Sequence, residues 1–86
     1  MMKTKKYFAK VEYPDWGRDG DKLLVKPLNP DVKYEVDCFM FGKSSTFIEL
    51  LDVNGKPFMG AFNAISFGFY DEDGNRVSRY EIKKYE

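Results

Sequence analysis

Apolar and polar residues alternate along several short stretches of this chain. Four segments show the pattern: residues 7–13, 33–41, 46–53 and 65–70. Successive side chains of a strand point to opposite faces, so a period of two residues predicts β-strands. Shorter strands are expected at residues 22–26, where Leu23 and Val25 share a face, and at residues 58–61. No segment longer than a turn has the spacing of an amphipathic helix.

The alternation also assigns faces to the longest predicted strand, residues 33–41. Its core face would hold Tyr34, Val36, Cys38 and Met40. The outer face, continued on the next strand, would hold Phe39, Phe41, Phe47 and Leu51. Large apolar side chains on the outside of a small sheet need a cover. Either the terminal strands of the chain or a partner must supply it.

Turn signals separate these segments. Asn54-Gly55 is typical of a hairpin because both residues tolerate a positive φ. Gly74 suits a left-handed position in the loop 71–75. Residues 62–64 are expected to form one 3₁₀ turn, and residues 77–85 form either a last strand or a short helical tail.

This order of hairpins, with a single turn before a later strand, resembles an SH3-like barrel. We therefore expect residues 1–86 to form one all-β domain. The expected fold is a small SH3-like barrel of about five to seven short antiparallel strands, with at most one short 3₁₀ or helical turn. Closure would also protect the edges of so small a sheet from aggregation.

Composition excludes several kinds of chemistry. The chain has no histidine, the commonest general base and metal ligand. Its one cysteine, Cys38, excludes an internal disulfide and a cysteine-based zinc site, and the apolar run around it favours a small buried side chain. The acidic residues beside Trp16 and at 71–73 lack the EF-hand spacing. We expect no enzyme, no cofactor and no metal.

Hydropathy and the N-terminus indicate a location. Hydrophobic residues make up 43% of the chain, which is too many for a disordered protein. No run approaches the roughly 18 apolar residues of a membrane-spanning helix. The basic residues 1–6 are not followed by the apolar stretch of a signal peptide. Together with an unpaired thiol, this predicts a cytoplasmic protein that does not bind membranes.

Charge is segregated along a chain whose formal net charge is zero. Residues 1–13 and 76–86 are basic, and residues 14–75 are acidic. If the terminal strands pair, the basic ends would form a patch for nucleic acid. Its residues would be Lys3, Lys5, Lys6, Lys10, Arg76, Arg79, Lys83 and Lys84. Alternatively, these lysines and arginines are solvated and keep the edge of the sheet from pairing with another chain. The sequence pI of about 6.3, which is low for a nucleic-acid-binding domain, favours this alternative.

Trp16 is alone in a polar loop between Pro14 and Gly17. Tryptophan is enriched at interface hot spots, although it could also fold back as a lid on the barrel. The candidate protein-binding site consists of Trp16, Phe39, Phe41 and Phe47. Its expected partner is a host protein or a second copy of the chain. A structural role in a virion would instead predict a higher oligomer.

Two motifs lie between residues 34 and 70. A turn of small residues, Gly-Lys-Ser-Ser-Thr at 42–46, leads into Phe-Ile-Glu-Leu at 47–50, and Gly-Ala-Phe-Asn-Ala-Ile-Ser-Phe follows at 60–67. This arrangement resembles small phage-encoded SH3-like β-barrel proteins of unknown function. The resemblance implies a mobile-element origin and a binding role rather than a reaction. We expect a non-enzymatic accessory or host-interaction factor, for example an inhibitor of a host protein, with a small nucleic-acid-binding barrel as the alternative.

Overall fold

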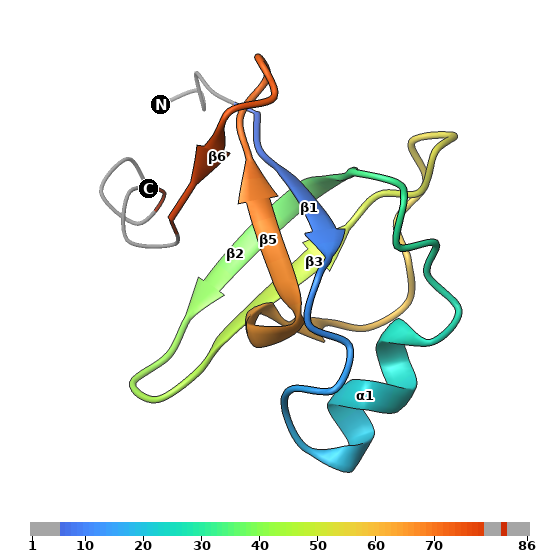
Figure 1. Ribbon diagram of the computed structural model, residues 1–86, viewed down its shortest axis with the longest axis vertical. Helices are drawn as coiled ribbons and strands as arrows, with labels where there is room; N and C mark the ends of the chain where they lie inside the picture. Colours follow the sequence, from blue (N-terminus) through green and yellow to red (C-terminus); the bar gives the residue numbers. More distant parts are fainter. Residues whose placement is uncertain (1–5, 79–81, 83–86) are drawn as a thin grey trace.

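Six antiparallel strands form one sheet in the computed structural model, which describes residues 6–78 and 82 (Figure 1). The strand order within that part of the chain is β4-β3-β2-β1-β5-β6. The strands are β1 Phe8–Val11, β2 Tyr34–Phe41, β3 Thr46–Leu50, β4 Phe62–Asn63, β5 Phe67–Tyr70 and β6 Arg76–Val77. Helix α1, Asp19–Val25, and the 3₁₀ turn η1, Ala64–Ser66, complete the described elements. The predicted small all-β architecture is confirmed.

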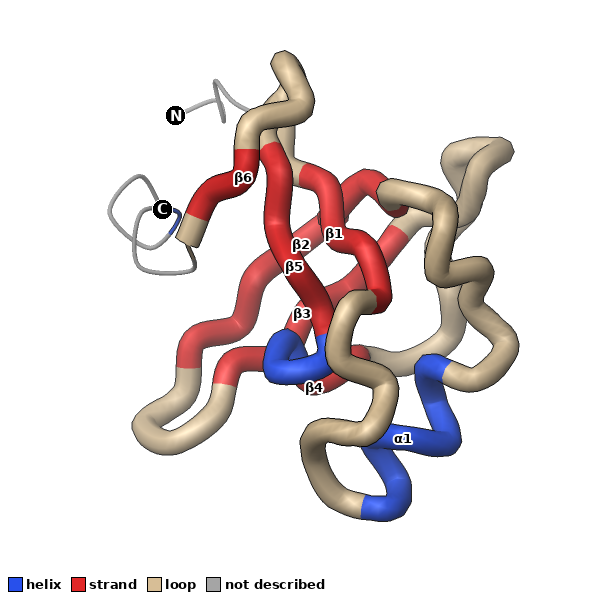
Figure 2. The backbone as a smooth tube through the Cα atoms, viewed as in Figure 1, coloured by secondary structure: helices blue, strands red, loops and turns tan. Residues whose placement is uncertain are grey.

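The sheet bends so that β1 and β5 cross over β2 and β3 (Figure 1). Buried side chains from both pairs of strands, among them Ala9, Ile48 and Phe69, form one core between them. Ile82, near the end of the chain, is also fully buried in this core. Helix α1 and η1 contact each other at one end of the sheet, where Figure 2 shows both in blue.

An extra residue interrupts the pairing of β2 with β3. Val36 lies opposite Leu50, but the next pair is Cys38 with Glu49, so Asp37 has no counterpart on β3. This β-bulge shifts the alternation of side chains by one residue. Residues before Asp37 therefore follow the predicted face assignment, and residues after it do not.

The bulge makes the predicted faces wrong for the second half of β2. Phe39 lies opposite the buried Ile48, and Phe39 and Phe41 are half-buried against the core. Cys38 and Met40 lie on the outer side instead, where Met40 is 40% exposed. A register shift of one residue exchanges the two faces of a strand, which is why the phase inferred from Tyr34 fails here.

The predicted strand at residues 22–26 is wrong, because this segment belongs to helix α1. The Asp21 carboxylate accepts the backbone N–H of Arg18 at 3.0 Å and caps the first turn. Acidic Asp19 and Asp21 suit the positive end of a helix, and Pro27 prevents a longer one. The apolar residues Leu23, Leu24 and Val25 are consecutive and not three or four residues apart, so the sequence shows no helical stripe here, and only Val25 is buried.

Other boundaries differ by a few residues. The Asn54-Gly55 turn is confirmed, with Gly55 at φ +82° and its N–H donating to the Asp52 carbonyl at 2.9 Å. The predicted strand at 58–61 is wrong, since Gly60 adopts φ +85° and β4 begins only at Phe62. The 3₁₀ turn lies at Ala64–Ser66 rather than at 62–64. Within residues 77–85, the structure describes only 77, 78 and 82.

Candidate functional site

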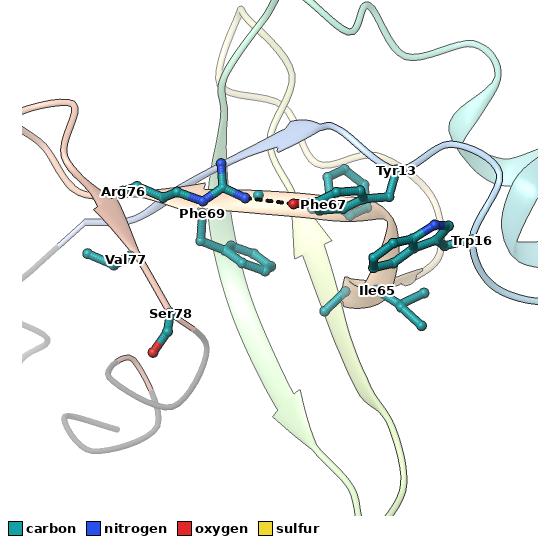
Figure 3. A pocket seen from close by; sticks show the side chains of 10 residues that line it. Tyr13, Trp16, Ile65, Phe67, Phe69, Arg76, Val77 and Ser78 are labelled. Carbon is teal, nitrogen blue, oxygen red and sulfur yellow. Dashed lines mark hydrogen bonds between the residues drawn. The ribbon is translucent and has the colours of Figure 1, made fainter.

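A shallow groove of about 270 Å³ runs along β5 from η1 to β6 (Figure 3). Tyr13 and Trp16 line it from the segment after β1, and Ile65 lines it from η1. Phe67 contributes from β5 and Arg76 from β6. The segment after β1 therefore meets η1, β5 and β6, which come much later in the chain, in one hollow.

Trp16 is 53% exposed, but its neighbours determine its position. Its indole stacks on the ring of Tyr13, with centroids 4.3 Å apart and planes 15° from parallel. The backbone N–H of Trp16 donates to the backbone carbonyl of Tyr13 at 3.1 Å, and the backbone carbonyl of Trp16 accepts the hydroxyl of buried Ser66 at 3.4 Å. The loop thus presents a large apolar ring to solvent in one defined place.

The guanidinium of Arg76 connects the groove to the outer face of the sheet. It donates to the hydroxyl of Tyr13 at 3.0 Å, as Figure 3 shows, and to the hydroxyl of Tyr70 at 3.1 Å. It also forms a 2.6 Å salt bridge with Glu12. Tyr70 donates its own hydroxyl to the other oxygen of the Glu12 carboxylate. This network links β6 to β5 and to the end of β1.

Three groups of the network, Glu12, Tyr70 and Arg76, have shifted pKa values. Burial would raise the pKa of Glu12, but hydrogen bonds from Tyr70 and Arg76 and the charge of Arg76 lower it below its ordinary value. The hydrogen bond to Glu12 raises the pKa of Tyr70, and the same carboxylate raises the pKa of Arg76. At neutral pH the site therefore contains a carboxylate, a neutral phenol and a guanidinium, which suits a rigid support rather than a nucleophile.

The structure separates the four residues of the predicted protein-binding site. Trp16 lies in the groove. Phe39 and Phe41 pack against the core and stack on each other at 5.7 Å between centroids. Phe47 is 38% exposed and lines a different hollow beside Met40. Only Trp16 and Phe47 therefore present large exposed surfaces, and they do so in different places.

Sequence reasoning missed Tyr13, Ile65 and the role of Arg76 in the groove. Tyr13 and Ile65 belong to the alternating segments 7–13 and 65–70, which predicted strands, whereas Ile65 is 36% exposed in η1. Arg76 was expected in a basic patch, but Glu12 balances its charge. The sequence did contain a signal for the contact between Tyr13 and Trp16. The two residues are three positions apart across the turn at Pro14, and a turn of that length brings two aromatic rings together.

The basic residues of the predicted nucleic-acid patch are only partly described. Those outside the described residues are Lys3, Lys5, Arg79, Lys83 and Lys84. Among the others, Lys6 precedes β1, Lys10 lies within it and Arg76 lies in β6. Strands β1 and β6 do not pair with each other, because β5 lies between them. Binding of nucleic acid by this patch stays a prediction.

Two absences hold for residues 6–78 and 82. No group of three or more cysteine, aspartate or glutamate side chains is arranged to hold a metal ion there. None of the helices in the same part of the chain has the length and hydrophobicity needed to cross a membrane.

Comparison with known proteins identifies the family. A family model described as bacteriophage T4 protein Y07B matches residues 6–86, which includes the groove, the bulged strand and the buried Ile82. No curated protein and no solved structure matches the chain. The match covers nearly the whole sequence, and the chain therefore belongs to the phage family of bacteriophage T4 protein Y07B.

Proposed function

We propose that this protein is a non-enzymatic phage accessory factor that binds a protein partner through the groove beside Trp16. A protein of the host is the expected partner, and the host cytoplasm is the expected location. Membership in a phage family supports the accessory role. The η1 turn directly before β5 supports the resemblance to an SH3-like barrel.

The exposure of Trp16 is the observation that carries the proposal. An unconstrained tryptophan in a polar loop would reduce its exposed apolar area by folding onto the core. Trp16 is instead kept half in solvent by Tyr13, whose hydroxyl Arg76 holds in turn. A large ring fixed before binding loses little side-chain entropy on binding, and such rings dominate many interfaces.

Site-specific crosslinking in infected cells tests the proposal. A photoreactive tryptophan analogue at position 16, which keeps the indole ring, is expected to capture one discrete partner protein. The matched control carries the same analogue at Val53, which is 76% exposed in the Asn54-Gly55 turn. Identical adducts at both positions, or none at position 16, would contradict the proposal. Capture of nucleic acid at position 16 would favour the alternative function.

Substitution of Trp16 measures the contribution of the ring once the partner is isolated. Trp16→Ala is expected to weaken binding by about thirtyfold or more, because truncating a central tryptophan typically removes at least ~2 kcal/mol. Isothermal titration calorimetry gives the affinity, and the melting temperature should change little because the ring is half exposed. Unchanged affinity for the alanine variant would exclude the groove as the contact.

A further inference from the structure

The bulge at Asp37 creates a second surface, separate from the groove. We call it the β2–β3 outer face and define it by Asp37, Met40, Phe47 and Glu49. Met40 lies directly opposite Phe47, and Glu49 is paired across the bulge. In a bulge, two residues of one strand oppose one residue of its neighbour, so Asp37 lies beside Glu49. All four positions are on the side of the sheet away from the core.

The centre of this face is apolar and exposed. Met40 is 40% exposed and Phe47 is 38% exposed, and opposite residues of an antiparallel pair are close enough to form one patch. A hollow of about 400 Å³ adjoins both side chains at the turn 42–45. The patch can therefore receive an apolar side chain of a partner.

The strand positions around the patch carry negative charge. Asp37 is exposed and Glu49 is half-buried. Neither carboxylate forms a salt bridge with a residue among those described. Lys43 in the adjoining turn is the cation that borders the hollow, and it lies at the far end from the bulge. The patch thus has an acidic margin along the strands and one lysine at its tip.

These charges decide among possible occupants. Two copies of the face would bring Asp37 and Glu49 either toward the same residues of the partner copy, where like charges oppose association, or toward its Lys43, which supplies one cation against two carboxylates. The phosphates of nucleic acid or of anionic lipid would be repelled in the same way. A protein segment with lysine or arginine beside apolar side chains would instead be attracted by both features.

We propose that the β2–β3 outer face binds a basic protein segment, with an apolar side chain of that segment between Met40 and Phe47. The cationic side chains of the segment lie against Asp37 and Glu49. This contact does not use Trp16 or the groove, so it stands or fails independently of the function proposed above. It would allow one small protein to hold two partners.

A pair of synthetic peptides tests the proposal on the full chain by ¹⁵N NMR titration. One peptide alternates lysine with valine and phenylalanine, and the other has glutamate in place of each lysine. The lysine peptide is expected to shift the amides of Met40, Phe47 and their neighbours, and the glutamate peptide is expected to cause no shifts. The double variant Asp37→Asn/Glu49→Gln should weaken binding about tenfold, and Phe47→Ala should weaken it as well.

Asp31→Asn/Asp73→Asn is the control, because it changes the net charge equally at two exposed sites elsewhere. It should leave the affinity within about twofold of wild type. Equal weakening by both double variants would show non-specific attraction and overturn the proposal. Shifts confined to other surfaces, or no binding, would overturn it too. A dimer that Phe47→Ala dissociates would assign the face to a second copy instead.

Discussion

Gly68 leaves the space in β5 through which Glu12 reaches its partners. A methyl group on this glycine would occupy the position of the Glu12 carboxylate. From that position Glu12 accepts the hydroxyl of Tyr70 and pairs with Arg76. The φ of Gly68 is not in the left-handed region, so space rather than backbone conformation requires glycine here.

Replacing Gly68 with alanine tests this requirement. Gly68→Ala should lower the free energy of unfolding by about 1–3 kcal/mol, because the displaced carboxylate loses its hydrogen bonds. In a Glu12→Ala background the same substitution should change it by less than about 1 kcal/mol. Urea unfolding of the four proteins gives the coupling between the two positions. An equal loss in both backgrounds would show that the methyl group acts through something other than Glu12.

The lowered pKa of Glu12 makes part of the stability depend on pH. A carboxyl group whose pKa is lower in the folded protein stabilises the fold above its unfolded pKa, about 4.3, and this contribution disappears as the pH falls through the folded value. Wild type should therefore exceed Glu12→Gln in stability at neutral pH, and the difference should shrink below about pH 4. Chemical unfolding at several pH values measures it, and a constant difference would contradict the assignment.

At the scale of elements, Asn63 joins β4, η1 and α1. Its side-chain oxygen accepts the N–H of Ile65 at 3.1 Å and caps η1. Its amide nitrogen donates to Asp21 of α1, also at 3.1 Å. Asp21 in turn caps its own helix through Arg18. One side chain thus sets where η1 presents Ile65 relative to the loop that carries Trp16.

Two substitutions at Asn63 separate these roles. Asn63→Ala loses both contacts and should lower the free energy of unfolding by about 1–2 kcal/mol. Asn63→Asp keeps the cap of η1 but places a second carboxylate against Asp21. Near neutral pH this variant should be at least as unstable as Asn63→Ala, and its free energy of unfolding should recover at acidic pH. Thermal unfolding at two pH values distinguishes them. An aspartate variant as stable as wild type at pH 7 would show that the link to Asp21 is unimportant.

At the scale of the whole molecule, the core draws on both ends of the described chain. Tyr7 precedes β1 and is buried, and Ile82 is 0% exposed. Phe39 and Val77 pack against the same cluster. Phe39, which the sequence placed outside, is therefore covered in part by Tyr7 and by the rest of this core.

Truncation of Ile82 should destabilise the whole fold. Ile82→Ala is expected to lower the free energy of unfolding by about 2–5 kcal/mol, the usual range for a fully buried isoleucine. Val53→Ala, at a position 76% exposed, should change it by less than about 0.5 kcal/mol. Guanidinium unfolding compares the two. A loss near zero for Ile82→Ala would mean that the core does not depend on this part of the chain.

Local pattern was sufficient for the β class, for the order of the longer strands and for the turns at Asn54-Gly55 and Gly74. Alternation of apolar side chains reflects a repeat in the backbone itself, and glycine at a tight turn reflects the backbone angles that the turn requires. Such signals act over a few residues, so they can be read without knowing the neighbours. Trp16 was singled out for the same reason, since its loop is polar on both sides, but the sequence left open whether its ring is exposed or folds back on the barrel.

Tertiary structure alone decided the bulge at Asp37, helix α1 and the groove. A bulge depends on how β2 pairs with β3, and nothing in the alternation from Tyr34 to Phe41 marks the residue at which the phase changes. Helix α1 forms through a cap and through contacts with η1 and β4, while it buries only Val25. The groove joins Tyr13 to Arg76, 63 residues later in the chain. Contacts between such distant residues arise only when the sheet bends, and a local pattern does not encode them.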